Sequence, residues 1–184
     1  MFVGSRLDAY KKELEDYKSD LLDYKNLAIT GIYKVGSRSM VSALFENISN
    51  LFDLAIIDDN FLTIDSILKS INNTSGKILL AIPNYSQRDL QFQGDFQRLL
   101  QGSKLQIHTI INVSLKDYIN LDTVFSISVK PIRKVKILLP RDFSQTKILI
   151  KEYLPDLSDD MLLAEIFKLS GGIPGLVKSA CNVY

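Results

Sequence analysis

The feature that most limits the fold of this chain is a regular alternation between short apolar runs and longer amphipathic segments. The runs have strand length, and the segments between the earlier runs repeat apolar residues at helical spacing. Parallel strands require long crossovers of this kind, whereas antiparallel strands can be joined by short turns. The sequence therefore predicts an α/β domain with a five-stranded, mostly parallel sheet and helices on both faces. The predicted strands are residues 26–30, 54–57, 77–82, 105–113 and 135–139, and helices are expected after Ser39, at 62–72 and at 88–101.

The pattern changes at Pro140, after which only helical periodicity remains. Ser158 is the expected N-cap of one later helix, and Pro174 suits the first turn of another. We therefore expect an α/β core over residues 1–140 and a small all-helical lid over residues 141–184. The three lid helices are predicted near residues 144–153, 159–169 and 174–183.

Composition excludes some classes of site. The net charge of +1 provides no overall field that would favour nucleic acid or an acidic membrane surface. Cys181 is the one cysteine, so an internal disulfide cannot form, and a cytoplasmic location is the simplest expectation. One cysteine and one histidine also argue against a zinc site. We expect neither a signal peptide nor a membrane-spanning segment.

Residues 6–26 are predicted to form a helix with one apolar stripe. Such a stripe is either the face by which a helix packs on its own domain or a short seam that binds a partner. The sequence leaves both interpretations open. The stripe consists of Leu7, Tyr10, Leu14, Tyr17, Leu21 and Tyr24.

A turn with two spaced glycines joins the first predicted strand to the following helix. Gly31 and Gly36 have the spacing of the phosphate-binding pattern G-x-x-x-x-G-K-[ST], in the strand–loop–helix context that this pattern requires. In such a loop, backbone N–H groups and the helix N-terminus face the phosphates. The next two positions hold Ser37 and Arg38 instead of lysine and a hydroxyl residue. Ser37 lacks the charge that the lysine brings to the terminal phosphates, and Arg38 cannot ligate Mg²⁺.

Three segments together carry a resemblance to a known family. Phe2-Val3-Gly4-Ser5-Arg6 precedes the first strand, Gly36-Ser37-Arg38-Ser39-Met40 follows it, and Ser170-Gly171-Gly172-Ile173-Pro174 lies in the predicted lid. In this order they resemble the "FVGR" opening, the "GKTSL" loop and the "GGxP" lid signature of archaeal-type ATPases in the STAND branch of the AAA+ P-loop ATPases. The resemblance implies an adenine pocket near Phe2, Val3 and Pro174. It also implies that phosphates face the loop that includes Gly31, Gly36, Ser37, Arg38 and Ser39.

The same resemblance identifies catalytic positions that have been replaced. In the family, the apolar strand that matches residues 77–82 ends in Asp-Glu, which supports Mg²⁺ and activates water. Here that strand is followed by Pro83 and Asn84, and neither residue can act as a general base. Asn112, at the end of the fourth predicted strand, corresponds to the polar sensor residue of the family.

Two competing assignments remain open. A shift by one residue would give Arg38 and Ser39 the roles of the lysine and the hydroxyl, although a guanidinium fork is a poor substitute for an ammonium group in a tight loop. Asp58 or Asp59, after the strand at 54–57, could instead ligate a metal. The strand order of the family, however, puts that strand away from the phosphates.

Charged residues outside these motifs have two interpretations each. A basic run is either a solvated loop or a contact with nucleic acid. Separate arginines are either plain surface residues or arginine fingers for a neighbouring subunit. The basic run consists of Lys130, Arg133, Lys134 and Lys136, and the separate arginines are Arg88, Arg98 and Arg141.

These observations lead to one principal hypothesis and two alternatives. The principal hypothesis is a degenerate AAA+/STAND ATPase-like domain that acts as a scaffold or interaction module, with protein partners in a homo- or hetero-oligomer. It requires no cofactor and binds ATP or ADP with low affinity, without hydrolysis. The first alternative is an active, atypical ATPase that uses Arg38, Ser39 and Asp58 or Asp59. The second is an inactive subunit of a DNA-associated, replication-type ATPase assembly.

Overall fold

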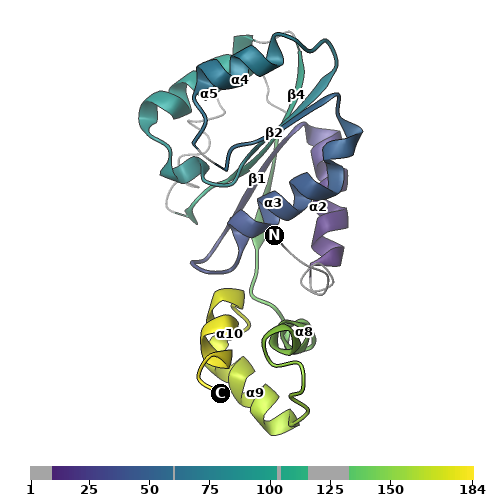
Figure 1. Ribbon diagram of the computed structural model, residues 1–184, viewed down its shortest axis with the longest axis vertical. Coiled ribbons are helices and arrows are strands. Elements are labelled where there is room, and N and C mark those ends of the chain that lie inside the picture. The colour runs from purple at the N-terminus through teal and green to yellow at the C-terminus, as the bar shows by residue number, and fades with distance from the viewer. Residues whose placement is uncertain (1–9, 60, 103–104, 116–132) are drawn as a thin grey trace.

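The computed structural model describes residues 10–59, 61–102, 105–115 and 133–184. A five-stranded sheet lies at its centre, and all of its strand pairs are parallel (Figure 1). The predicted α/β fold with a parallel sheet and a following helical segment is therefore confirmed. The strands are β1 (Asn26–Gly31), β2 (Leu54–Ile57), β3 (Lys77–Ile82), β4 (Gln106–Asn112) and β5 (Arg133–Leu138).

The strand order is β2-β3-β4-β1-β5, so β1 lies inside the sheet and β2 lies at an edge. The α-helices of the core are α2 (Lys11–Tyr24), α3 (Ser37–Ile48), α4 (Ile64–Ile71) and α5 (Leu90–Gly102). Two short 3₁₀ turns, η1 (Ser49–Leu51) and η2 (Tyr85–Gln87), follow α3 and β3. None of the helices in the described part of the chain has the length and apolar content needed to cross a bilayer.

Two hydrophobic layers cover the two faces of the sheet. Successive side chains of a strand point to opposite faces, so alternate residues of β3 enter different layers. Leu79 and Ala81 pack with α2 and α3, whereas Ile78, Leu80 and Ile82 pack with α4 and α5. This alternation explains why β3 is apolar at nearly every position, as expected for a parallel strand covered on both sides. The predicted placement of helices on both faces is confirmed.

Helix α2 uses its aromatic and aliphatic stripe to pack on its own domain. Tyr10, Leu14, Tyr17 and Leu21 are buried against α3 and the sheet. In the described region the stripe is therefore covered by this chain, and it is not free as a seam for a partner. The helix ends at Tyr24 because Lys25 leaves the helical conformation, with a positive φ of 60°.

Some helices begin at other residues than predicted, because side-chain caps fix where a helix starts. The helix predicted at 88–101 begins only at Leu90, because Arg88 is extended and the Asp89 carboxylate accepts the Phe92 N–H at 2.7 Å. The prediction of Ser158 as an N-cap was wrong. Asp159 caps the helix instead, since its carboxylate accepts the N–H of Met161 at 2.8 Å.

Leu139 and Pro140 lead from β5 into three helices that form a separate group below the sheet in Figure 1. Gly171, with φ of 57°, caps the second of these helices, and Pro174 starts the third, as the sequence predicted. The boundary predicted at residue 140 remains a prediction. The helices are α8 (Phe143–Tyr153), α9 (Asp160–Ser170) and α10 (Pro174–Cys181).

Candidate functional site

A cavity of about 770 Å³ lies where the carboxyl ends of β1, β3 and β4 face the lid helices. The loop between β1 and α3 forms its floor, the segments that follow β3 and β4 form one wall, and residues of α8 and α10 form the other. Ligands of parallel α/β sheets bind at this edge, outside the carboxyl ends of the strands. The cavity is therefore the candidate site.

The floor of the cavity has the backbone geometry of a strand–loop–helix phosphate cradle. Gly36 is the N-cap of α3 in a left-handed conformation, with φ of 96°, and Ser37 is the first residue of the helix. The N–H of Met40 donates to the Gly36 carbonyl at 2.9 Å, which closes the first helical turn. The residue directly after the last glycine is thus Ser37, at the position where the phosphate-binding pattern has lysine.

Gly31 is required by close packing at the start of the loop. A Cβ atom there would lie 2.5 Å from Val35 Cγ1 and 2.8 Å from the carbonyl oxygen of Leu138. The second contact is with backbone, which cannot move away without disturbing β5. The loop is thus held tightly between its own Val35 and the neighbouring strand.

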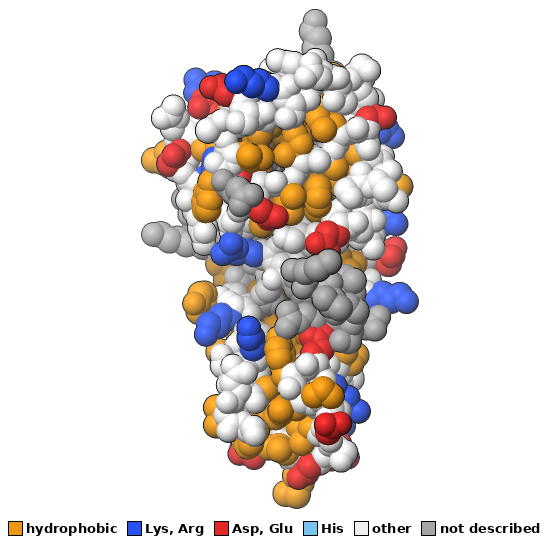
Figure 2. Space-filling model, in the orientation of Figure 1, with side chains coloured by type: hydrophobic (Ala, Val, Ile, Leu, Met, Phe, Trp, Pro, Cys, Tyr) orange, Lys and Arg blue, Asp and Glu red, His pale blue; other side chains and the backbone are white. Residues whose placement is uncertain are grey.

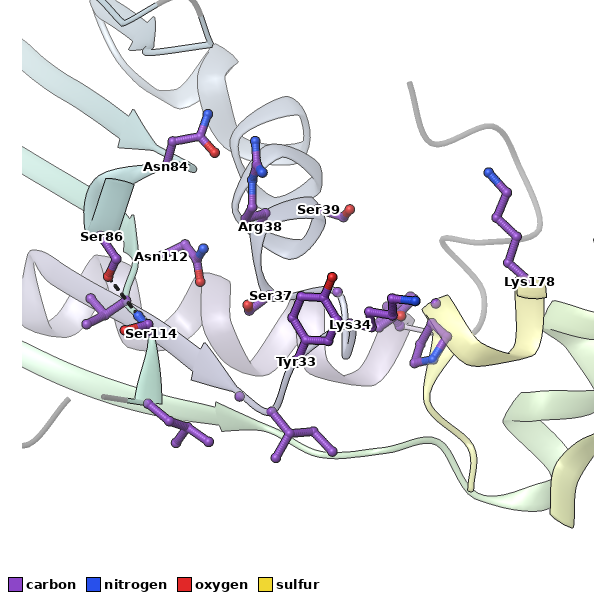
Figure 3. Close-up of a pocket in the computed structure, with 18 of the residues that line it drawn as sticks. Tyr33, Lys34, Ser37, Arg38, Ser39, Asn84, Ser86, Asn112, Ser114 and Lys178 are labelled. Carbon is purple, nitrogen blue, oxygen red and sulfur yellow. Dashed lines mark hydrogen bonds between the residues drawn. The ribbon is translucent and has the colours of Figure 1, made fainter. Parts of the chain in front are cut away.

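The polar wall consists of amide and hydroxyl side chains that follow β3 and β4 (Figure 3). Asn112 donates its amide N–H to the Pro83 carbonyl at 3.0 Å, and Ser86 accepts the Ser114 N–H at 2.8 Å. These two bonds tie the strand ends together. Asn84 is 6% exposed, and its Oδ1 atom has no hydrogen-bond partner among the described residues. The wall therefore presents a buried, unsatisfied amide to the cavity.

The opposite end of the cavity is more apolar. Tyr10, Leu149, Tyr153 and Pro174 contribute to it from α8, α10 and the residue before α2. Burial raises the pKa of Tyr10, partly offset by the neighbouring Arg141, whose guanidinium lies 4.1 Å from the centre of the tyrosine ring. The phenol is therefore neutral at physiological pH, and this end of the cavity suits a flat, uncharged group.

The structure gathers most of the residues that the sequence had marked as a site. Pro174 comes from the lid, Asn112 from β4, and the others from the loop and the first turn of α3. Phe2 and Val3 lie outside the described residues. The predicted residues that line the cavity are Gly31, Gly36, Ser37, Arg38, Ser39, Asn112 and Pro174.

Other lining residues were not marked as a site by the sequence. Lys178 stands one helical turn after Pro174, and that spacing could have placed both on one face of α10. Ser86 and Ser114 follow strand ends, but this position did not single them out, because hydroxyl residues are common in loops. Tyr10 belonged to the apolar stripe of α2, so its second role was not visible in the sequence.

Asp58 and Asp59 are not brought to the cavity. They follow the edge strand β2, which β3 and β4 separate from β1. Asp58 is buried, accepts the Leu62 N–H at 2.6 Å and pairs with Arg88 at 3.4 Å. Asp58 thus holds its own loop together.

The three separate arginines differ in exposure. Arg98 is on the surface and pairs with Asp95 on the same helix. The side chain of Arg88 is only 8% exposed, and its guanidinium lies 3.7 Å from the centre of the Phe92 ring. Arg141 is buried and pairs with Glu13. The prediction that Arg88 and Arg141 are plain surface residues was thus wrong in the described structure, because both side chains join distant segments within the domain.

The basic run also differs from a solvated loop where it is described. Lys134 and Lys136 lie on β5, where Lys136 pairs with Asp20 and lies 5.3 Å from the Tyr17 ring centre. Lys134 Nζ lies 5.0 Å from the ring centre of Tyr24. Both lysines therefore face α2. Lys130 lies outside the described residues.

The residues present do not fit a Mg²⁺ site of the ATPase kind. No carboxylate is among the described residues that line the cavity. The described residues also contain no group of three His, Cys, Asp or Glu side chains placed to share a metal ion. Mg²⁺ is usually held by carboxylates together with phosphate oxygens and water. By contrast, the glycine loop and the helix N-terminus fit a phosphate group.

No protein-family model and no curated protein match the sequence, but solved structures match the fold. A Walker-type ATPase from Pyrococcus abyssi has 13% identity and a TM-score of 0.59, and the match covers 94% of this chain and 66% of that one. A RuvB variant from Thermotoga maritima has 14% identity and a TM-score of 0.62, covering 98% of this chain and 61% of that one. The Saccharomyces cerevisiae Hsp104 in complex with casein has 14% identity and a TM-score of 0.63, covering 95% of this chain and 36% of that one.

This chain thus spans less than two thirds of the length of each of these proteins. All three are AAA+ P-loop ATPases, and their similarity to this chain is one of fold. The parallel sheet, the glycine loop between β1 and α3, and the helices after β5 agree with it. The chain has the fold of an AAA+ P-loop ATPase domain.

Proposed function

We propose that this domain binds the phosphate chain of ATP or ADP over residues 31–39 without hydrolysing it, and that it acts as a scaffold or protein-interaction module. The observation that carries the proposal is the composition of the cavity. A phosphate cradle is retained, while the described lining provides amides, hydroxyls and cations but no carboxylate. Hydrolysis in P-loop ATPases needs a metal ion and a group that orients water.

The two ends of the cavity suit different parts of a nucleotide. The first turn of α3 presents free N–H groups and the positive end of the helix dipole to a phosphate. The apolar end, with Tyr10 and Tyr153, suits a base. Because the lysine of the pattern is replaced by Ser37, we expect weak binding, with a Kd on the order of 0.1–1 mM.

Calorimetric titration with ATP and with ADP tests the binding. The informative variant is Ser37→Asp, which puts a carboxylate at the first position of α3. An acidic residue there stabilises the helix by about 0.3–1 kcal/mol, so the variant should fold. The same charge repels phosphate, and we expect binding to be lost. Ser66→Asp is the matched control, since it adds an acid to the exposed first turn of α4, away from the cavity.

A turnover assay with Mg²⁺ separates this proposal from the active ATPase that would use Arg38, Ser39 and Asp58 or Asp59. We expect no release of phosphate above background. Turnover that depends on Mg²⁺ and disappears in both Arg38→Ala and Asp58→Asn would contradict the proposal and support the alternative. Asp58→Asn should be read beside its melting temperature, because Asp58 pairs with buried Arg88.

Exposed apolar side chains of the lid support the role of protein-interaction module. Figure 2 shows hydrophobic side chains on the surface of the lid, and exposed apolar side chains that gather into a contiguous patch commonly mark contact sites. Sedimentation velocity with and without ATP tests self-association, and a monomer at all concentrations would leave only a hetero-oligomer. The exposed side chains are Ile148, Met161, Leu169, Val183 and Tyr184.

A further inference from the structure

Arg38 is a cation beside the phosphate cradle, and no described residue pairs with it. It is the second residue of α3, its side chain is exposed, and it lines the cavity. It forms no hydrogen bond or ion pair with another described residue. In the phosphate-binding pattern, this position carries the hydroxyl that holds the metal ion. Here a permanent positive charge replaces that metal ligand.

Asn84 is a second, independent indication of a ligand. Its side chain lines the cavity and is more than nine-tenths buried, and Oδ1 has no partner in the part of the chain that the structure describes. Figure 3 shows the side chains of Asn84 and Asn112 extending from the strand ends toward the first turn of α3, which carries Arg38. The amide NH₂ group of Asn84 can donate a hydrogen bond to a phosphate oxygen in the cavity.

The charge of the cavity disfavours an additional divalent cation. The charged side chains among its described lining residues are Lys34, Arg38 and Lys178, all positive. A Mg²⁺ ion would meet these cations, and the described lining offers no carboxylate to offset them. A metal-free polyphosphate carries more negative charge than its Mg²⁺ complex. The same three cations and the end of the α3 dipole therefore favour the metal-free form.

We propose that Arg38 takes the place of the divalent cation, so that the cavity selects nucleoside polyphosphate free of metal. The guanidinium of Arg38 and the amide of Asn84 contact the terminal phosphate, and a guanidinium can do so through two parallel hydrogen bonds. This inference rests on the proposed function, because it requires that the cavity bind a nucleotide. Beyond that function, the metal-free form of the nucleotide binds in preference to its Mg²⁺ complex, and Arg38 determines the preference.

The test compares ATP in excess EDTA with ATP in excess Mg²⁺, by calorimetry on the 184-residue chain at constant ionic strength. We expect the metal-free form to bind at least tenfold more tightly. Arg38→Ala should lower the affinity for metal-free ATP by tenfold to a hundredfold, in the range of a lost hydrogen bond to a charged group. Arg38→Lys should keep part of the affinity, because it retains the charge but loses the fork. Arg98→Ala, which removes an exposed arginine paired with Asp95, should change nothing.

Asn84→Asp tests whether Asn84 contacts the phosphate. If Asn84 had only a structural role, this substitution would not change the preference for metal-free ATP over its Mg²⁺ complex. The introduced carboxylate would repel metal-free ATP and offer a ligand to Mg²⁺. We expect the preference for metal-free ATP to shrink or reverse, while Asn84→Ala lowers the affinity for both forms. Circular dichroism melts of each variant establish that the fold is kept.

The outcomes separate the two proposals. If neither form of ATP binds to the wild-type chain at millimolar concentration, the proposed function fails and this inference fails with it. If ATP binds but its Mg²⁺ complex binds equally well or better, the proposed function stands and the role of Arg38 is overturned. Full affinity for metal-free ATP in a folded Arg38→Ala variant overturns it as well.

Discussion

The N–H of Gly175, in the first turn of lid helix α10, donates to the carbonyl oxygen of Lys34, in the loop between β1 and α3, at 3.1 Å. A Cβ atom on Gly175 would lie 2.7 Å from Lys34 Cβ, so the two backbones approach as closely as a glycine permits. Lys34 itself is left-handed, with φ of 64°. The lid and the loop between β1 and α3 therefore meet backbone to backbone.

Gly175→Ala should loosen this contact. The added methyl group must displace Lys34 or α10, and we expect a loss of about 1–3 kcal/mol in the free energy of unfolding, as for other overpacked sites. Urea unfolding measures it. Gly94→Ala is the matched control, because a Cβ there meets nothing within 4 Å and its helix α5 should gain about 0.5–1 kcal/mol. Equal effects of the two substitutions would show that the close approach has no energetic weight.

Gly172→Ala should be the most damaging glycine substitution in the lid. Gly172 has φ of 71°, and a Cβ there would lie 1.9 Å from the carbonyl oxygen of Arg141. The N–H of Arg141 also donates to the Gly172 carbonyl at 2.7 Å, so neither backbone can retreat freely. We expect a loss of about 3 kcal/mol or more, or a chain that does not fold. Gly171 is also left-handed, but a Cβ there would meet nothing within 4 Å. Gly171→Ala should therefore lower the free energy of unfolding by only about 1 kcal/mol in thermal melts.

Arg141→Met tests the buried contact between the lid connector and α2. Arg141 pairs with Glu13 and covers the Tyr10 ring, so its loss leaves the Glu13 carboxylate without its partner. We expect a destabilisation of about 3 kcal/mol, typical of breaking a buried pair from one side. Arg98→Ala, at the exposed pair with Asp95, should change stability by no more than about 0.5 kcal/mol in the same urea titration. If Arg141→Met left the free energy of unfolding unchanged, the methionine would stabilise the fold as well as the ion pair does.

Stability should fall on mild acidification because of His108. Burial lowers the pKa of this imidazole, and the hydrogen bond to the Leu21 carbonyl at 3.2 Å offsets the shift only in part. The unfolded chain therefore takes up a proton, at a pKa near 6.5, before the folded chain does. The free energy of unfolding is then unaffected well above pH 6.5 and declines as the pH falls below that value. Melting temperatures between pH 7.5 and 5 should decline less steeply for His108→Gln, and parallel curves would contradict the assignment.

The fold could be predicted largely from local patterns. Each strand of the interior is apolar because both of its faces are covered, and each helix repeats apolar residues every three to four positions. The glycine loop was recognisable for the same reason, since its spacing and its place between strand and helix are both local. The strand β5 was placed two residues late, because only its pairing with β1, from Asn26 with Arg133 to Gly31 with Leu138, shows where it begins.

The site was only partly predictable. Asn84 could be recognised from the sequence as a missing acid, but not as a buried amide without a partner, since burial depends on what packs around it. Arg88 and Arg141 looked like surface residues because arginine usually is one. Each guanidinium instead packs against aromatic side chains, that of Arg88 against Phe61 and Phe92 and that of Arg141 against Tyr10.

By itself the sequence determined the succession of strands and helices, the phosphate-type loop between Gly31 and Ser39, and the helices that follow Pro140. These features depend on residues within a few positions of one another, whose backbone preferences act wherever the chain goes. Only the tertiary structure decided that β1 lies between β4 and β5, that Asp58 is bound to Arg88 away from the cavity, and that Lys178 and Tyr10 line it. Those relationships are contacts between segments far apart in the chain, and they arise from packing, which no local pattern contains.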